Sequence, residues 1–168
     1  DETYIDVSGS SFREFFEGKN SAFPGEHPTL SDWANHLSTI FPEVRLKRYL
    51  EMRGADGVPW GRLPALPAFW VGLLYDDQSL NAAWDLVSHW TAQERQALRD
   101  DVPRFGFKAK IRDRYLFEIA RECLTLSHAG LRRRGHIDQL GRDESRYLEP
   151  LEHILEAGRT PAEEMLDK

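Results

Sequence analysis

Two side chains of opposite charge, Glu51 and Arg53, stand two residues apart in the segment YLEMRGADGVPWGRLPALPAFWVGLLYD. On an extended strand they project from one face, about 6.5–7 Å apart along the chain. A carboxylate can hold a divalent cation through oxygen, and a neighbouring guanidinium can grip a phosphate oxygen. The pair therefore suits a metal–nucleotide site. The alternative is an exposed strand whose charges are solvated or paired across strands.

The segment around this pair predicts one strand from Val44 to Arg53, because apolar and ionisable residues alternate along it. Its charged face would carry Arg45, Lys47, Tyr49, Glu51 and Arg53. A turn rich in glycine and proline follows and contains Trp60. The glycines of this turn form neither a P-loop nor a dinucleotide fingerprint.

Other reactive residue types form no recognisable site. The six histidines lack the spacings His-x-x-x-His and His-Glu-x-x-His that are typical of metal sites. Cys123 lies on an apolar helical stripe with no activating neighbour, which predicts an inert thiol. The arginines at 132–134 suit either a phosphate or the negative end of a helix dipole.

Composition narrows the class of protein. A length of 168 residues suits one domain with a hydrophobic core. The net charge of -6 argues against affinity for nucleic acid or anionic membrane, and no apolar run approaches the ~20 residues of a membrane span. One cysteine excludes an internal disulfide and fits a reducing cytosol, so we expect a cytoplasmic protein. The abrupt start at Asp1 is typical of a piece of a longer chain.

Most of the remaining sequence predicts helices. Thr29 or Ser31 can cap a helix that ends before Pro42, and the capping-box spacing recurs at Thr91 and Thr160. A short extended segment is expected at 4–7 and an irregular or short extended link at 105–113. Helices are expected at 30–40, 67–76, 80–87, 116–134, 147–157 and after Pro161. The expected fold class is α+β, mainly α.

Three stretches are distinctive: HLSTIFPEVRLKRYLEMRGADGVPWGRLPALPAFWVGLLYD, WTAQERQALRDDVPRFGFKAKIRD and GRTPAEEML. They resemble the plant-type glutamate–cysteine ligases, which also occur in proteobacteria. The resemblance runs from about Tyr4 to Leu166 and matches the C-terminal part of such an enzyme. It implies a glutamine-synthetase-like fold, with helices packed on a short antiparallel sheet. Residues 1–168 would then form one domain, with a hairpin, a helix and the active-site strand in 1–62 and helices in 63–168.

The resemblance also implies an activity and a site. The family joins the γ-carboxylate of glutamate to cysteine at the expense of ATP, with Mg²⁺, in the first step of glutathione synthesis. Glu51 in the Glu-Met-Arg motif would then be a metal ligand. Arg53 would be both a catalytic residue and a contact to the ATP phosphates, and Trp60 and Trp70 would wall the substrate pocket.

The sequence departs from the family pattern in two ways that bear on the regulation and the activity of this chain. Plant members carry a regulatory cysteine pair in a hairpin that corresponds to Tyr4–Gly25, and Val7 and Ala22 occupy those positions here. The N-terminal part, which holds most substrate and metal contacts in the family, is missing. We therefore expect the chain alone to be inactive and to self-associate. The alternatives are a ligase with another amine acceptor and a non-catalytic helical interaction module.

Overall fold

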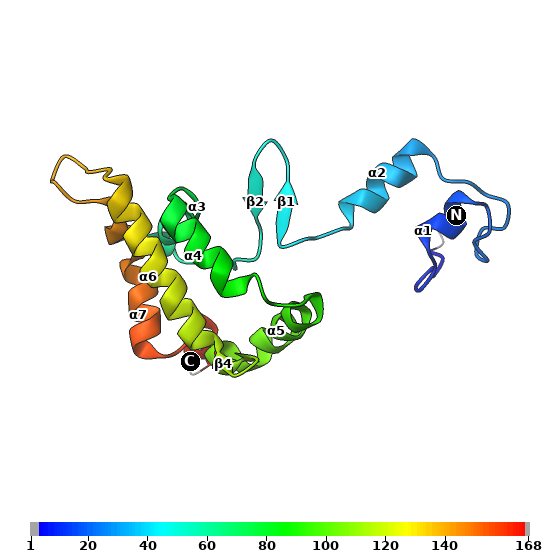
Figure 1. The fold of residues 1–168 in the computed structure, drawn as a ribbon. Coiled ribbons are helices and arrows are strands. Elements are labelled where there is room, and N and C mark those ends of the chain that lie inside the picture. Colours follow the sequence, from blue (N-terminus) through cyan, green and yellow to red (C-terminus); the bar gives the residue numbers. More distant parts are fainter. Residues whose placement is uncertain (1–3, 167–168) are drawn as a thin grey trace. The chain divides into compact units, whose positions relative to one another are not determined.

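The computed structural model describes residues 4–166, and the chain divides into two units, Asp1–Ala55 and Asp56–Lys168 (Figure 1). Helices dominate, and each unit contains one two-stranded antiparallel sheet. The expected mainly helical α+β class is confirmed at this level.

Two capped helices begin the first unit. Helix α1 spans Phe12–Phe16 and helix α2 spans Leu30–Ser38. Thr29, rather than Ser31, caps α2: its hydroxyl accepts a hydrogen bond from the Asp32 backbone amide, and the Asp32 side chain accepts one from the Thr29 amide. The predicted cap at Thr29 is therefore confirmed, although α2 ends before Ile40.

The expected extended segment and hairpin before residue 25 are wrong. Among described residues 4–25 the structure forms α1 and turns, with no strand. Gly9, Gly18 and Gly25 all adopt positive φ, which turns the chain away from an extended course. The capping box of Ser11 and Glu14 starts a helix where a strand would need a partner.

The single strand expected from Val44 to Arg53 is also wrong, since the segment is a β-hairpin (Figure 1, cyan). Strand β1 spans Val44–Leu46 and strand β2 spans Leu50–Met52. The Lys47 amide donates to the Tyr49 carbonyl at 2.9 Å and closes the tip. Because the pairing is symmetric about the tip, residues of equal parity still share a face, and the predicted charged face survives.

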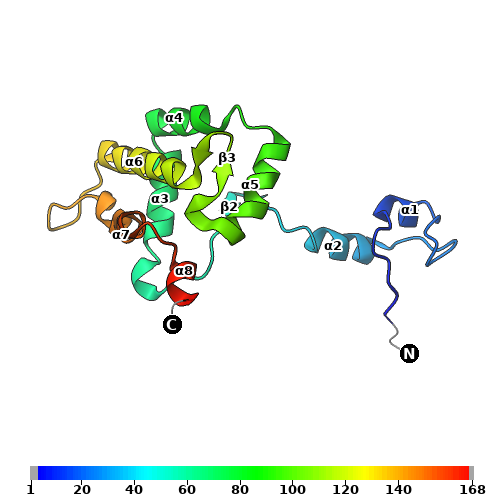
Figure 2. The same cartoon turned by 90° about the horizontal axis from the view of Figure 1, so that it is seen from below.

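The second unit is helical, as expected (Figure 2). Its 3₁₀ turns are η1 (Trp60–Arg62), η2 (Gly106–Lys108) and η3 (Glu144–Leu148). Its strands are β3 (Lys110–Ile111) and β4 (Arg114–Tyr115). Strand β3 lies in the expected irregular or short extended link, and β4 follows directly after it. Its helices are α3 (Ala65–Leu74), α4 (Asp77–Val87), α5 (Ala92–Phe105), α6 (Leu116–Arg134), α7 (Glu149–Ala157) and α8 (Pro161–Leu166).

The helix boundaries of the second unit follow its local signals. The Thr91 hydroxyl accepts a hydrogen bond from the Glu94 amide, and the Glu94 side chain accepts one from the Thr91 amide. Helix α6 ends at Gly135, whose left-handed φ of 67° suits glycine. Tyr147 and Leu148, expected in a helix, form the end of η3 instead.

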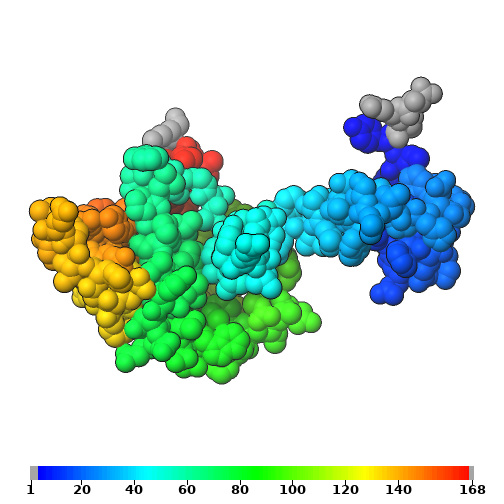
Figure 3. Space-filling view, turned by 90° about the horizontal axis from the view of Figure 1, so that it is seen from above, coloured from blue at the N-terminus to red at the C-terminus, as the bar shows by residue number. Residues whose placement is uncertain are grey.

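Helix α6 organises the core of this unit, because α3, α4 and α7 all pack against it. Ala68, Leu124, Leu131 and Leu148 form the buried cluster. Helices α3 and α6 approach so closely that a Cβ on Gly130 would overlap the Gly72 carbonyl oxygen. In Figure 3 the residues coloured green to red fill a continuous mass, in agreement with this packing.

Two of the three arginines at the end of α6 have structural partners. Arg133 makes a charge-assisted pair with Asp76 at 2.6 Å and donates to the Ser79 hydroxyl at 2.8 Å. Arg134 pairs with Glu144 at 3.4 Å. These contacts favour the structural reading of the triplet over a phosphate site.

Candidate functional site

The charged face of the hairpin surrounds one carboxylate with three cations. Arg45 Nε donates to Glu51 Oε2 at 2.8 Å, and this pair follows from the cross-strand register of the two residues. Lys47 Nζ lies 3.6 Å from Glu51 Oε1, and Arg53 Nε lies 3.7 Å from Oε2. The structure therefore brings together the two residues predicted from their spacing, Glu51 and Arg53.

The hydrogen bond from Arg45 is the largest cause that lowers the pKa of the Glu51 carboxyl below its ordinary value. The positive charges of Arg45, Lys47 and Arg53 act in the same direction, against partial desolvation. The group therefore stays ionised near neutral pH. An ionised carboxylate accepts hydrogen bonds and ligates cations, and it cannot act as a proton donor.

Arg53 retains donor capacity. Its Nη1 atom is buried and has no hydrogen-bond partner among residues 4–166. The guanidinium carbon lies 5.4 Å from the centroid of the Phe41 ring, and the Arg53 amide donates to the Glu43 carbonyl at 2.8 Å. Backbone pairing and the aromatic face thus fix a guanidinium that still offers hydrogen bonds.

The donor set fits a metal only in part. Residues 4–166 contain no group of three His, Cys, Asp or Glu side chains that could hold an ion. Mg²⁺, however, is commonly bound through one or two carboxylates together with water and phosphate oxygens. The ionised Glu51 side chain, which is 27% exposed, can supply one such ligand.

The two tryptophans belong to the second unit, whereas Glu51 and Arg53 belong to the first. Trp60 lies in η1 with 87% of its surface exposed. Trp70 lies on α3, partly buried, with its ring edge-on to Phe69 at 5.4 Å. Nothing in these contacts tests whether either indole walls a substrate pocket, so that assignment stays a prediction.

Sequence reasoning missed the contacts that Arg45 and Lys47 make with Glu51. It placed all of them on one face but assumed one strand, in which Arg45 and Glu51 would stand far apart. The hairpin makes them cross-strand partners. The tip sequence Lys47–Tyr49 lacks the Asn-Gly or Asp-Gly dipeptide that usually marks a two-stranded turn, so no strong local signal was present.

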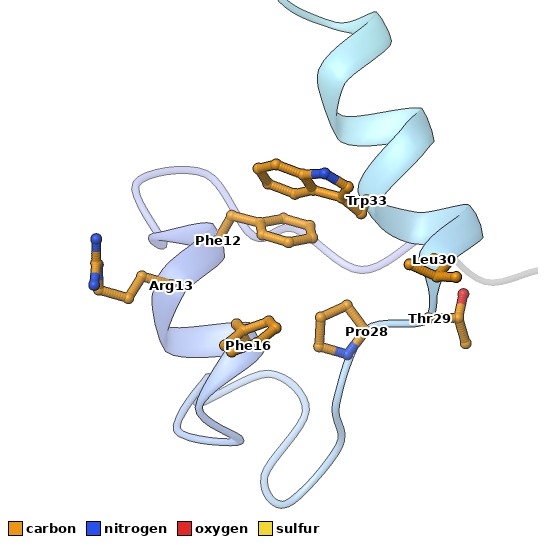
Figure 4. A pocket seen from close by; sticks show the side chains of 7 residues that line it. All are labelled: Phe12, Arg13, Phe16, Pro28, Thr29, Leu30 and Trp33. Carbon is orange, nitrogen blue, oxygen red and sulfur yellow. The ribbon is translucent and has the colours of Figure 1, made fainter.

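A hollow lies between α1 and α2 within the first unit (Figure 4). It measures about 580 Å³ and is lined mainly by Phe12, Phe16, Pro28, Leu30 and Trp33. The lining is almost wholly apolar, with Arg13 at one side. Apart from Arg13, it offers apolar contact surface and no group suited to acid–base chemistry.

Cys123 behaves as expected of a structural thiol. Burial is the largest cause that raises its pKa, and the charge of Glu122 adds to the effect. The thiolate is therefore disfavoured, and with it nucleophilic reactivity. Separately, none of the described helices combines the length and the apolar character needed to cross a membrane.

Comparison with known proteins assigns the sequence of this chain to a family. Residues 3–168 match the family model described as glutamate-cysteine ligase family 2. The chain is 54% identical to the chloroplastic glutamate–cysteine ligase of Nicotiana tabacum and 56% identical to ligase A of Oryza sativa subsp. indica. It is also 54% identical to the Arabidopsis thaliana enzyme.

Each of these alignments covers 98% of the chain and 30–32% of the relative, so the chain spans about a third of the length of the curated relatives it matches. A family match over nearly every residue, supported by identities above one half, leaves no competing assignment. The chain belongs to glutamate-cysteine ligase family 2.

Proposed function

We propose that this chain is the C-terminal portion of an ATP-dependent glutamate–cysteine ligase. One observation carries the proposal: identity of 54–56% to ligases from three plants extends over 98% of the chain. The N-terminal part of the same enzyme is then the principal partner, and it supplies most contacts to glutamate, cysteine and ATP. The isolated chain is inactive, because orientation contributes ~7–11 kcal/mol to such reactions and requires every wall of the site.

Within the complete enzyme the β1–β2 hairpin belongs to the active-site floor of a glutamine-synthetase-like fold. Residues 1–168 act as one domain there, and Trp60 and Trp70 line the substrate pocket. The position of Glu51 and Arg53 on one hairpin face supports this placement, since both side chains project toward the same side. The exposed indole of Trp60 is available to such a pocket.

The reaction has two steps. A γ-carboxylate oxygen of glutamate attacks the terminal phosphorus of ATP, and the bond to the bridging oxygen breaks so that ADP leaves. The amine of cysteine then attacks the carbonyl carbon of γ-glutamyl phosphate, phosphate leaves, and the nitrogen loses a proton. Arg53 donates hydrogen bonds to the phosphoryl oxygens, where negative charge builds in the first step.

A bound Mg²⁺ ion would neutralise charge on the nucleotide phosphates. Glu51 would hold it through its carboxylate, whose lowered pKa keeps the negative charge available. The nucleotide, water and the rest of the enzyme would supply the other ligands. Arg53, fixed against Phe41, stays beside that ligand and orients the phosphate.

The test is an assay of the complete enzyme with glutamate, Mg²⁺-ATP and a panel of amines that includes cysteine, 2-aminobutyrate, glycine and ammonia. We expect amide formation with cysteine to dominate. A strong preference for another amine would favour the alternative ligase reading. Absence of ADP release with every amine would favour the non-catalytic interaction module and would contradict the proposal.

The compartment is a separate proposal. The single cysteine led us to expect the cytoplasm, whereas the named relatives are chloroplastic, which favours a plastid for the complete protein. Subcellular fractionation with antibodies against this chain distinguishes the two locations.

A further inference from the structure

The charged face of the hairpin carries more positive side chains than the Glu51 carboxylate can pair. By strand alternation it carries Arg45, Lys47 and Arg53 together with Glu51 and Glu43, so cations outnumber carboxylates. All three cations lie within 4 Å of Glu51, but only Arg45 is within hydrogen-bond distance. A single carboxylate cannot satisfy the donors of three cations at once.

Much of this donor capacity is unused within the part of the chain that the structure describes. Arg45 donates to Glu51 through Nε alone, which leaves its two Nη groups to other acceptors. Lys47 is 3.6 Å from Glu51, beyond a good hydrogen bond, and its side chain is 43% exposed. Arg53 Nη1 is buried and unpaired. An unpaired buried donor is costly, so Arg53 favours an incoming anion, and the solvent-exposed donors of Arg45 and Lys47 are available to the same anion.

The spacing of the cations indicates what kind of anion. Lys47 lies at the hairpin tip, Arg45 in the middle opposite Glu51, and Arg53 just beyond the other end. Successive same-face positions are about 6.5–7 Å apart, so the backbone positions of the three cations form a row of roughly 13 Å. Their charged ends lean toward its centre, where each lies within 4 Å of Glu51. The Glu51 carboxylate reaches all three, but Lys47 and Arg53 stay 3.6 and 3.7 Å away, beyond a good hydrogen bond. An extended polyphosphate, with charged oxygens along its length, can meet all three.

We propose that Arg45 and Lys47 bind the polyphosphate of the nucleotide and that Glu51 holds them in position until it arrives. This rests on the proposed ligase function for the nature of the ligand. On binding, Arg45 and Lys47 exchange Glu51 for phosphate oxygens, and the released carboxylate is free to serve as the cation ligand. Arg45 and Lys47 are thus phosphate-binding residues in addition to Arg53.

The experiment is calorimetric titration of inorganic tripolyphosphate into the complete ligase that carries this chain, without divalent metal. Arg45→Gln and Lys47→Gln should each weaken binding about tenfold, the worth of a charge-assisted hydrogen bond. Glu51→Gln should strengthen it, because the competing carboxylate is gone. Arg48→Gln is the matched control: it removes one cation from the same hairpin tip, but on the opposite face, and should leave binding unchanged.

Steady-state kinetics of the same variants provide the second measurement. Arg45→Gln should raise the KM for ATP and leave the KM for glutamate unchanged. Equal tripolyphosphate affinity in wild type, Arg45→Gln and Lys47→Gln overturns the proposal, as does an equal loss in Arg48→Gln, which marks a general charge effect. If Arg45→Gln instead raises the KM for glutamate, the cations bind a substrate carboxylate, and this result also overturns the proposal.

The two readouts separate this inference from the proposed function. Tripolyphosphate binding needs no ligation, so a protein that joins glutamate to no amine can still show the expected order of affinities. In that case the proposed ligase function fails and the polyphosphate row stands. If the enzyme ligates glutamate to cysteine normally but wild type and variants bind tripolyphosphate equally well, the polyphosphate inference fails and the proposed ligase function stands.

Discussion

The two units of the chain differ in how their side chains are buried. In the second unit Leu131 and Leu148 are fully buried, and α3, α4 and α7 close around α6. In the first unit Asn20 is the one buried side chain among described residues 4–55. Large apolar residues are open to solvent there, with Leu30 87% and Leu46 80% exposed.

This contrast separates local from tertiary stabilisation. Capping boxes and a backbone ladder form the helices and the hairpin of the first unit, but such signals alone are marginal in water. The second unit adds a packed core to equally good caps. The charged hairpin face thus lies on the unit with less tertiary packing. Contacts with the rest of the enzyme would add most to the local stability of this unit.

The largest expected effect separates chemistry from stability. Glu51→Gln in the complete ligase should lower Mg²⁺-dependent kcat/KM by about 10²–10³-fold, the usual loss when one group that handles transition-state charge is removed. The melting temperature should change little, because the hairpin buries little surface. Turnover with varied Mg²⁺ and thermal unfolding measure the two effects. Near-normal turnover with unchanged Mg²⁺ dependence would exclude Glu51 as a metal ligand.

The next prediction tests the packing of the second unit. Gly130→Ala should destabilise the chain by about 1–3 kcal/mol, because the added methyl overlaps the Gly72 carbonyl oxygen at the α3–α6 crossing. Gly54→Ala is the control from the first unit, where an added Cβ meets nothing within 4 Å. Its effect should be near zero. Urea denaturation of both variants measures the difference, and equal losses would refute the contrast between the units.

A third prediction compares local stability within one molecule. Backbone amides of α2 in the 168-residue chain should exchange with deuterium at least tenfold faster than those of α6, because α2 has no buried residue. Hydrogen exchange followed by mass spectrometry gives both rates in one sample. In the complete ligase the α2 amides should slow. Equal protection of α2 and α6 in the short chain would mean that the first unit is stable by itself.

The smallest expected effect is the pH dependence of stability that arises from the ion pair between Glu94 and Arg112. The hydrogen bond from Arg112 is the main cause that lowers the pKa of Glu94 to about 2, from an ordinary 4.5. Because the folded-state pKa is the lower one, the stabilisation is present above about pH 4.5 and is lost as pH falls toward 2.

Glu94→Gln keeps the capping-box side chain and removes the charge. Its melting temperature should therefore lie slightly below that of wild type at pH 7, and the gap should close between pH 4.5 and 2. Thermal unfolding across this range provides the check. A gap that does not vary with pH would mean that the pair with Arg112 contributes nothing through charge.

What the sequence predicted correctly was encoded within a few residues. Thr29, Thr91 and Thr160 each stand three positions before an acidic partner, and each caps a helix. The apolar stripe of α6 and its closing Gly135 are equally local. Such signals need no knowledge of the distant chain.

What it missed depended on pairing. The alternation from Val44 to Arg53 is the same for one strand and for a hairpin centred on Arg48, so the period alone could not distinguish them. The contact between Arg45 and Glu51 exists only in the hairpin, and it is therefore the part of the candidate site that sequence reasoning lacked. The roles of Glu51, Arg53, Trp60 and Trp70 remain predictions.

The tip of the hairpin has a consequence for how this segment tolerates insertions and deletions. Side chains alternate with a period of two, so one residue added between Leu46 and Leu50 would shift the pairing wherever the loop keeps its three residues and the strand absorbs the addition. Arg45 would then face Leu50 or Met52 instead of Glu51, and the row of cations would be divided between two sides. An insertion that shifts the register would therefore divide the charged face, whereas exchange of Arg48, on the opposite face, would leave the pairing of Arg45 with Glu51 in place.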